Sequence, residues 1–232
     1  MGDPAHVLCV CTANVCRSPA AELLLRTGLL ARLGQQAAQA VVVTSAGTWA
    51  SPRRPVEPGT ASALRRHGVD PAEIAATRST RLTPQAVSAS DLILAATAEH
   101  VRAVWRFQLA ARHRTFTVGE LARLSEAVGT GDLPAGDAAL RLRELVSRVS
   151  ELREQRRGPT GPYVTDAYDL ADPTDDEPAQ RDMVAQTALW VDFLLDLLAG
   201  PAPARRSTRD RVPGVARALQ WSRHRAARGA IR

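Results

Sequence analysis

Short apolar runs alternate with longer amphipathic stretches along most of this chain. The short runs are typical of buried strands, and the longer stretches carry apolar residues at helical spacing. We expect strands near residues 7–11, 41–45, 91–95 and 113–117. We expect helices near residues 18–33, 58–67, 97–108 and 177–199. Because crossovers of this length join parallel strands, the pattern predicts an α/β fold of three layers, a doubly wound four-stranded parallel sheet with helices on both faces.

The segment after the first expected strand carries the most information about function. Residues 11–19 read Cys-Thr-Ala-Asn-Val-Cys-Arg-Ser-Pro, with an apolar run before them and a helix-prone run after them. A loop between a strand and the N-terminus of a helix is the usual anion site of α/β proteins. Five residues separate Cys11 from Arg17, and a serine follows directly. This spacing predicts a loop that binds phosphate around a cysteine nucleophile.

The residue types in this loop suit attack on a phosphate ester. The thiolate of Cys11 is the reactive form, and a helix N-terminus together with an arginine lowers the pKa of a thiol. Arg17 can hold two phosphate oxygens with its planar guanidinium. Ser18 can hydrogen-bond the sulfur and improve it as a leaving group. The backbone N–H groups expected around the phosphate belong to Thr12, Ala13, Asn14, Val15, Cys16 and Arg17.

This loop resembles the signature of the low-molecular-weight protein tyrosine phosphatases. Further segments resemble the same family in the same order. They are Thr44–Thr48, Ala63–Asp70, Ser79–Thr83, Asp91–Leu94 and Asp172-Pro173. The resemblance covers residues 6–124 and 166–199, and it implies a flavodoxin-like fold and a metal-free phosphatase without a cofactor.

The resemblance also implies roles for the loop residues. It makes Cys11 the nucleophile, Arg17 the phosphate-binding residue and Ser18 the residue that assists departure of the thiolate. It makes Asn14 the brace of the loop and Cys16 the partner of Cys11 in a reversible disulfide. One departure is Ala13, where the family usually has glycine, since alanine is costly at a positive φ.

A carboxylic acid above the loop is needed to protonate the leaving oxygen. The Asp-Pro pair of the family corresponds to Asp172-Pro173, and proline places the carboxylate on a rigid turn. We therefore expect Asp172 to be the general acid. Asp169 is the alternative, because several aspartates lie nearby.

Substrate class depends on the mouth of the pocket. Trp49 follows the Thr44–Thr48 segment, where the family places an aromatic side chain, and it can stack on a tyrosine ring. Thr174 stands where the second family aromatic is usual. We expect a phosphotyrosine-containing protein as substrate.

Three alternatives are weighed against this expectation. A sister group that dephosphorylates arginine shares Thr12 but carries threonine where this chain has Val15. Arsenate reductases share the fold but use further downstream cysteines, and no cysteine follows Cys16. A phosphate-binding regulatory module without strong catalysis is the third alternative, motivated by Ala13 and by the missing second aromatic.

The chain divides into an expected phosphatase domain, residues 1–200, and a tail, residues 201–232. Residues 125–165 are an insertion relative to compact family members, with an amphipathic helix expected within 138–149, and it is either a lid or a solvated surface excursion. The tail carries nine arginines and one aspartate, a charge of +8, so residues 1–200 carry −2 of the total of +6. Such a tail can contact an acidic partner, nucleic acid or an anionic membrane, or it can lack a partner.

Composition is that of an ordinary globular protein, with 45% hydrophobic and 23% charged residues. The first twenty residues show no secretory pattern. The three cysteines, Cys9, Cys11 and Cys16, provide no disulfide framework. A thiolate nucleophile favours a reducing compartment, so we expect a cytoplasmic protein.

Overall fold

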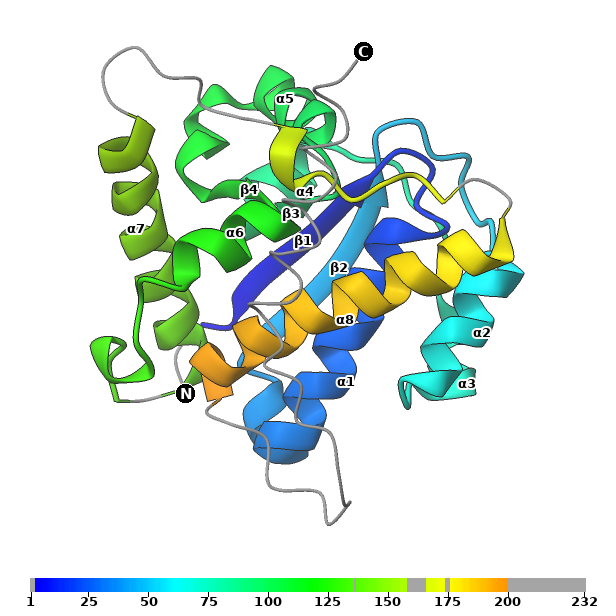
Figure 1. Cartoon of the computed structure of the whole chain (residues 1–232), viewed down its shortest axis with the longest axis horizontal. Helices are drawn as coiled ribbons and strands as arrows, with labels where there is room; N and C mark the ends of the chain where they lie inside the picture. The colour runs from blue at the N-terminus through cyan, green and yellow to red at the C-terminus, as the bar shows by residue number, and fades with distance from the viewer. Residues whose placement is uncertain (1–2, 136, 158–165, 174–175, 200–232) are drawn as a thin grey trace, which may run out of the picture.

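The computed structural model describes residues 3–135, 137–157, 166–173 and 176–199. Four parallel strands form one sheet in the order β2-β1-β3-β4 (Figure 1). They are β1 (Ala5–Cys11), β2 (Val41–Gly47), β3 (Leu92–Ala95) and β4 (Thr115–Thr117). The register pairs Ala5 with Val41 and Val7 with Leu92, so β1 lies between β2 and β3. The predicted four-stranded parallel sheet and its strand positions are confirmed.

Eight α-helices are described around this sheet, and each of the four predicted in the main pattern is present. They are α1 (Arg17–Ala38), α2 (Pro58–Arg66), α3 (Pro71–Ala76), α4 (Pro84–Ser88), α5 (Ala98–Phe107), α6 (Val118–Ser125), α7 (Ala138–Arg157) and α8 (Glu177–Ala199). Short 3₁₀ turns cover Leu109–Arg114, Thr130–Asp132 and Asp166–Tyr168. Proline at the first turn of α2, α3 and α4 sets their start.

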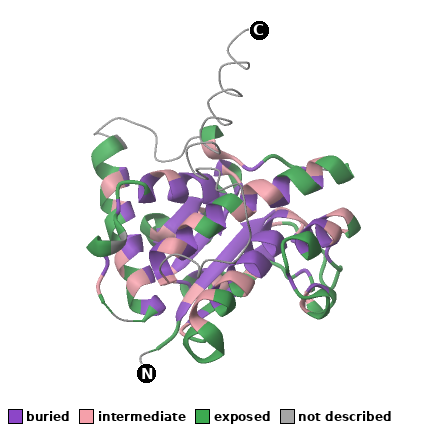
Figure 2. Ribbon diagram, turned by 60° about the horizontal axis from the view of Figure 1, so that its bottom comes forward, coloured by how far each residue is buried: buried purple, intermediate pink, exposed green. Residues whose placement is uncertain are grey.

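Alternation along β1 distributes its side chains between two cores. Val7, Cys9 and Cys11 join the larger cluster, with residues of α1, α2, α6, α7 and α8. Leu8 and Val10 face the smaller cluster, with residues of α4 and α5. Strands β1, β3 and β4 are buried apart from His6, whereas the edge strand β2 exposes Val42 and Thr44 (Figure 2). Burial of the central strands is what a parallel sheet covered on both faces requires. The three-layer prediction is therefore confirmed.

The insertion contributes α7 to the larger core. Leu142, Leu145 and Val149 are fully buried on its inner face. Arg143 donates to the carbonyls of Asp3 and Pro4 at 3.1 and 3.0 Å, so α7 lies beside the amino end of β1. The phosphate loop lies at the carboxyl end of the same strand. Residues 138–157 are consequently neither a lid nor a solvated excursion.

Two further segments of the sequence analysis are not placed. Residues 158–165 of the insertion and the arginine-rich tail, 201–232, lie outside the described residues. The division into a domain and a tail therefore stays a prediction. None of the described helices combines the length and the apolarity that crossing a membrane requires.

Candidate active site

The loop with the predicted phosphate-binding residues joins β1 to α1. Cys11 is the last residue of β1 and Arg17 is the first of α1, and both are buried. Cys16 is the N-cap residue of α1 and makes no side-chain capping hydrogen bond. Because the first N–H groups of a helix lack partners within the helix, they and the helix dipole favour an anion at this point.

Asn14 holds the loop in shape. Its φ of 57° lies in the left-handed region, which asparagine tolerates better than most residues. Its side-chain N–H₂ donates to the hydroxyls of Ser18 and Ser45, both at 2.8 Å. Its side-chain oxygen accepts from the backbone N–H of Thr80 at 2.8 Å. The buried amide therefore ties the loop to α1, to β2 and to the segment before α4.

Two donors surround the sulfur of Cys11. Ser18 Oγ lies 3.0 Å from Cys11 Sγ, and the backbone N–H of Asn14 donates to the same sulfur at 3.3 Å. Since Ser18 already accepts from Asn14, its own hydrogen is available to the sulfur or to the carbonyl of Ala46 at 3.3 Å. Hydrogen bonds to a thiolate stabilise the charged form, so this arrangement favours a nucleophile and a leaving group at Cys11.

A buried carboxylate lies behind this network. Ser45 donates to Glu22 Oε2 at 2.6 Å, and Arg26 lies 3.4 Å from the other oxygen. Burial raises the pKa of Glu22 above its ordinary value, while the bonds from Ser45 and Arg26 oppose that shift. A continuous hydrogen-bonded chain thus runs from Glu22 through Ser45, Asn14 and Ser18 to Cys11.

Arg17 extends across the loop toward the segment before α8. Its guanidinium is buried and donates to Thr12 Oγ1 at 3.2 Å and to the carbonyl of Leu170 at 3.4 Å. It also forms an ion pair of 2.7 Å with Asp172, whose side chain is 59% exposed. A buried arginine with an exposed carboxylate beside it can hold an anion and place a proton donor next to it.

Asp169 and Asp172 have different environments. Asp169 Oδ1 accepts from the backbone N–H of Ala98 at 2.6 Å, at the start of α5. The N–H of Leu170 donates to the carbonyl of Ala96 at 2.8 Å. These bonds anchor the segment at the carboxyl end of β3, and partial burial raises the pKa of Asp169. Within the described residues, Asp172 forms an ion pair with Arg17, whereas Asp169 does not.

His100 supports the other side of the loop. Its Nε2 lies 2.9 Å from Thr12 Oγ1, and its Nδ1 lies 2.6 Å from Thr97 Oγ1. Burial and the positive charge of Arg17 lower the pKa of His100 to about 4. The neutral imidazole therefore links α5 to the hydroxyl that Arg17 contacts.

Comparison with known proteins agrees with this geometry. Residues 6–137 match the family model described as low molecular weight phosphotyrosine protein phosphatase. The chain belongs to this family. It is therefore a member of a family of phosphatases, as the loop predicts. The matched segment ends before Asp172. The role proposed for Asp172 therefore depends on its ion pair with Arg17.

Curated relatives include both tyrosine and arginine phosphatases. A probable low molecular weight protein-tyrosine-phosphatase, EpsP of Ralstonia solanacearum, is 36% identical over 52% of this chain and 70% of its own length. The low molecular weight protein-tyrosine-phosphatase Etp of Escherichia coli K12 is 32% identical over 49% and 69%. A protein-arginine-phosphatase of Bacillus subtilis is 31% identical over 49% and 70%.

Solved structures share the fold of this phosphatase. The YwlE arginine phosphatase of Geobacillus stearothermophilus superposes with a TM-score of 0.56 over 83% of this chain and 92% of its own, at 23% identity. A low molecular weight protein tyrosine phosphatase of T. tengcongensis gives a TM-score of 0.55 over 83% and 98%, at 21% identity. These similarities establish the architecture.

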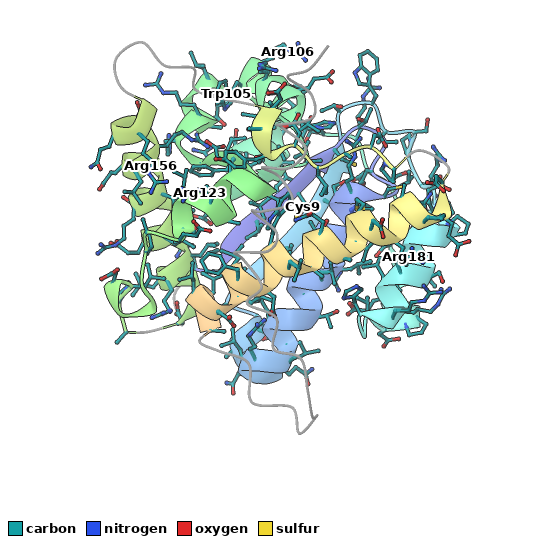
Figure 3. The ribbon with its side chains drawn as sticks, viewed as in Figure 1. Cys9, Trp105, Arg106, Arg123, Arg156 and Arg181 are labelled. Carbon is teal, nitrogen blue, oxygen red and sulfur yellow. The ribbon has the colours of Figure 1, made fainter. Side chains whose placement is uncertain are left out.

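The other two cysteines of the phosphatase are thiols with different surroundings. Cys9 lies in the centre of the sheet (Figure 3), and burial raises its pKa well above the ordinary value. Cys16 is half-buried, and its pKa is raised to about 11, mainly by burial, although a hydrogen bond with Thr60 opposes the shift. No disulfide joins these residues to Cys11.

Trp49 stands at the outer surface of the site. Its side chain is 76% exposed, and its backbone N–H donates to the carbonyl of Thr12 at 2.9 Å. Gly47 precedes it at a point of close approach, since a side chain there would collide with that same carbonyl. The backbone of Trp49 is consequently held beside the loop, and its aromatic side chain extends from there into solvent. Thr174 lies outside the described residues.

Sequence reasoning did not find several members of this site. Glu22 on α1 reaches the loop through Ser45 on β2, Thr80 reaches it from the segment between α3 and α4, and His100 reaches it from α5. The sequence holds no spacing signal for them, because the contacts join residues up to 88 positions apart. Ser45 and Thr80 lie in Thr44–Thr48 and Ser79–Thr83, two of the segments that resemble the family, and this resemblance was the signal for them.

Proposed function

We propose that this phosphatase hydrolyses phosphotyrosine in proteins through a cysteinyl-phosphate intermediate. The observation that carries the proposal is the pair of bonds from Ser18 and Asn14 to the sulfur of Cys11, with the Arg17–Asp172 ion pair above the same loop. One side of the loop supports a nucleophile, and the other supports a proton donor.

In the first step Cys11 attacks phosphorus and the bond from phosphorus to the ester oxygen breaks. The loop N–H groups and Arg17 hold the oxygens on which negative charge develops. Asp172 in its acid form gives its proton to the departing oxygen. The products of this step are the free hydroxyl and a phosphate bonded to Cys11.

In the second step water attacks phosphorus and the sulfur–phosphorus bond breaks. Asp172, now a carboxylate, takes a proton from the water. Ser18 stabilises the thiolate of Cys11 as it departs, because its hydroxyl lies 3.0 Å from the sulfur. Inorganic phosphate leaves, and Asp172 is again the acid.

Tyrosine is favoured as the substrate by two features of the loop and its mouth. Trp49 is exposed beside the loop and offers an aromatic face to a phenol ring. Val15 places an apolar branched residue where the arginine-specific group carries threonine. The tyrosine phosphatases among the relatives support the same choice.

Arginine is the second candidate. The Bacillus subtilis protein-arginine-phosphatase is nearly as similar as the tyrosine phosphatases. Thr12 is a shared feature of that group, and here its hydroxyl contacts Arg17. A phosphate-binding module with weak catalysis is disfavoured, since the nucleophile, the arginine, the serine and a carboxylate all meet at one loop.

A direct test uses three peptides of one sequence with phosphotyrosine, phosphoarginine or phosphoserine at the centre. We expect phosphate release from phosphotyrosine, and complete loss of release in Cys11→Ser. Preference for phosphoarginine would keep the mechanism and change the substrate. Absence of release from all three would support the binding module.

We further propose that the enzyme works in the cytoplasm, because a thiolate nucleophile favours a reducing compartment. The tail, residues 201–232, is proposed to contact an anionic partner, whether an acidic protein, nucleic acid or a membrane surface. Deletion of these residues should lower salt-dependent binding to DNA or to anionic vesicles. Unchanged binding after deletion would remove this proposal.

A further inference from the structure

Two chain segments next to the phosphate loop carry a local excess of positive charge. Residues 47–57, between β2 and α2, contain Arg53 and Arg54. Residues 77–82, between α3 and α4, contain Arg78 and Arg81. Glu57 is the one acidic residue in these two segments, although residues 1–200 as a whole carry a net negative charge. We call these four arginines the basic rim.

The first segment is attached to the phosphate loop at both of its ends. The backbone N–H of Trp49 donates to the carbonyl of Thr12 at 2.9 Å, and that of Glu57 donates to the carbonyl of Val15 at 3.0 Å. Figure 1 shows this segment as the long connection between β2 and α2. Arg53 and Arg54 therefore lie on a chain segment that leaves the loop and returns to it.

The second segment contacts the loop independently. Thr80 N donates to Asn14 Oδ1 at 2.8 Å, and Leu82 N donates to the carbonyl of Gly47 at 2.9 Å. Arg81 lies between these two contacts, and its backbone pairs with that of Gly47 in an isolated parallel β-bridge. Both sources of positive charge are thus placed by bonds to the site itself.

The two segments are also joined to each other. Arg53 N donates to the carbonyl of Ser79 at 2.9 Å, Ser79 N to the carbonyl of Arg54 at 2.9 Å, and Arg54 N to Ser79 Oγ at 2.9 Å. Arg53 has a φ of 68°, a conformation that L-residues rarely adopt without support. These bonds hold the backbone of the basic rim in one arrangement.

The charges of the rim are largely uncompensated. All four arginines are exposed. Arg54 pairs with Glu57 at 2.7 Å, and Arg78 donates to the carbonyls of Ala75 and Thr77. In the described part of the chain, the guanidinium groups of Arg53 and Arg81 contact no hydrogen-bond partner or carboxylate. A surface of this kind attracts negative charge, and it does so beside the pocket that receives the phosphoryl group.

We propose that the basic rim binds acidic residues adjacent to the phosphorylated residue of the protein substrate. This inference rests on the proposed phosphatase function, because the bound phosphoryl group fixes which part of the substrate reaches the rim. An extended peptide advances about 3.3 Å per residue, so side chains within three positions of the phosphorylated residue are within reach. The partner is therefore an acidic, phosphorylated segment of a protein.

The kinetic test compares two phosphotyrosine peptides, one with glutamate and one with glutamine at the three positions on each side. Wild type should hydrolyse the glutamate peptide with a kcat/KM about three- to tenfold higher, as expected for a few exposed ion pairs. The Arg53→Gln/Arg81→Gln variant should lose that preference. It should retain wild-type hydrolysis of p-nitrophenyl phosphate, which has no flanking residues.

A matched control removes two exposed arginines elsewhere. Arg106 on α5 and Arg156 on α7 (Figure 3) lie outside both rim segments. The Arg106→Gln/Arg156→Gln variant changes the net charge equally, and it should keep the peptide preference. In wild type the preference should also fall as salt rises from 20 to 300 mM, since screening weakens exposed ion pairs.

An equilibrium measurement separates failure of the rim from failure of catalysis. Cys11→Ser cannot form the intermediate, so the dissociation constants of both peptides can be measured on it and on Cys11→Ser/Arg53→Gln/Arg81→Gln. Tighter binding of the glutamate peptide, lost in the triple variant, supports the rim even if wild type releases no phosphate. Equal affinity for both peptides, or a preference that survives removal of Arg53 and Arg81, overturns the rim and leaves the phosphatase proposal untouched.

Discussion

Arg17 Nη2 and Asp172 Oδ2 lie 2.7 Å apart, so the proposed phosphate-binding residue and the proposed general acid are direct partners. The ion pair joins residues 155 positions apart, and it closes the segment before α8 over the phosphate loop. A phosphoryl group bound by Arg17 must share or replace this bond. Asp172 therefore has two opposing effects, since its carboxylate competes with phosphate and its acid form assists cleavage.

The first prediction separates these two effects. Asp172→Asn removes a negative charge beside the phosphate and also removes the transferable proton. We expect inorganic phosphate or vanadate to inhibit the variant severalfold more strongly, while kcat for phosphotyrosine falls about 10²-fold or more. The measurements are inhibition constants and steady-state kinetics at one pH.

The matched control for this prediction is Asp169→Asn. Asp169 accepts from Ala98 N and should affect the position of the segment, not proton transfer. Loss of kcat should then be similar for aryl esters with good and with poor leaving groups. A greater dependence on the leaving group in Asp169→Asn than in Asp172→Asn would transfer the acid role to Asp169.

A second prediction concerns the hydrogen bonds of Asn14. Asn14→Ala removes the donors to Ser18 and Ser45 and places alanine at a φ of 57°. Asn14→Gly removes the same donors but tolerates this φ. Because the hydroxyls of Ser18 and Ser45 lose a hydrogen-bond partner in both variants, kcat should fall at least about tenfold in each. Recovery of kcat in Asn14→Gly would show that only the backbone conformation matters.

The third prediction concerns Ala13. Among the described non-glycine residues, only Asn14 and Arg53 have a positive φ, so alanine is not strained at position 13. Ala13→Gly should therefore leave kcat within about twofold and should not raise the free energy of unfolding. A large gain in activity or stability would show that alanine distorts the loop. The measurements are steady-state kinetics and urea unfolding.

A fourth prediction is the acid sensitivity that His100 introduces. Its pKa is lowered to about 4 in the folded protein, below the ordinary value of 6.5. Between pH 4 and pH 6.5 the unfolded chain therefore binds more protons at position 100 than the folded protein does. The free energy of unfolding keeps its full value above pH 6.5 and decreases as pH falls toward 4. The corresponding loss of unfolding free energy is about 3 kcal/mol.

The variant His100→Asn provides the comparison. Glu22 and Glu120 have raised pKa values, so their contribution to the free energy of unfolding increases as pH falls, opposite to that of His100. The difference between wild type and variant removes that contribution. We expect the stability difference, measured by urea unfolding at pH 7, 5.5 and 4, to shrink as pH falls. A difference that is constant with pH would contradict the lowered pKa.

The fifth prediction concerns protection by Cys16. Peroxide converts the Cys11 thiolate to a sulfenic acid, and the thiolate of Cys16 can displace hydroxide from it to give a disulfide. Since the pKa of Cys16 is about 11, this second step should accelerate as pH rises from 6 to 8. Thiol reductant should restore activity to wild type more fully than to Cys16→Ser.

Cys9→Ala is the matched control for the redox prediction. Cys9 is fully buried and shares the face of β1 that carries Cys11. Its removal should leave recovery after peroxide unchanged. Equal recovery of wild type and Cys16→Ser would remove the protective role of Cys16.

The sequence alone determined the strands, the main helices and the phosphate loop, because these depend on local patterns. Apolar runs specify buried strands, and the interval from Cys11 to Arg17 matches the length of a loop around one phosphate. Even the helix within the insertion was predictable from its spacing of apolar residues. Its position was not, because the same amphipathic pattern fits a lid, a surface helix or the core helix that α7 forms.

Only the tertiary structure decided which distant residues complete the site. It placed Asp169 against the backbone N–H of Ala98 and Asp172 against Arg17, and this difference supports the proposal of Asp172 as the general acid. It brought Glu22, Ser45 and His100 to the loop, and it joined the two arginine segments through Ser79. Local propensity carries no information on such contacts, because they arise when parallel strands bring their carboxyl ends to one edge of the sheet.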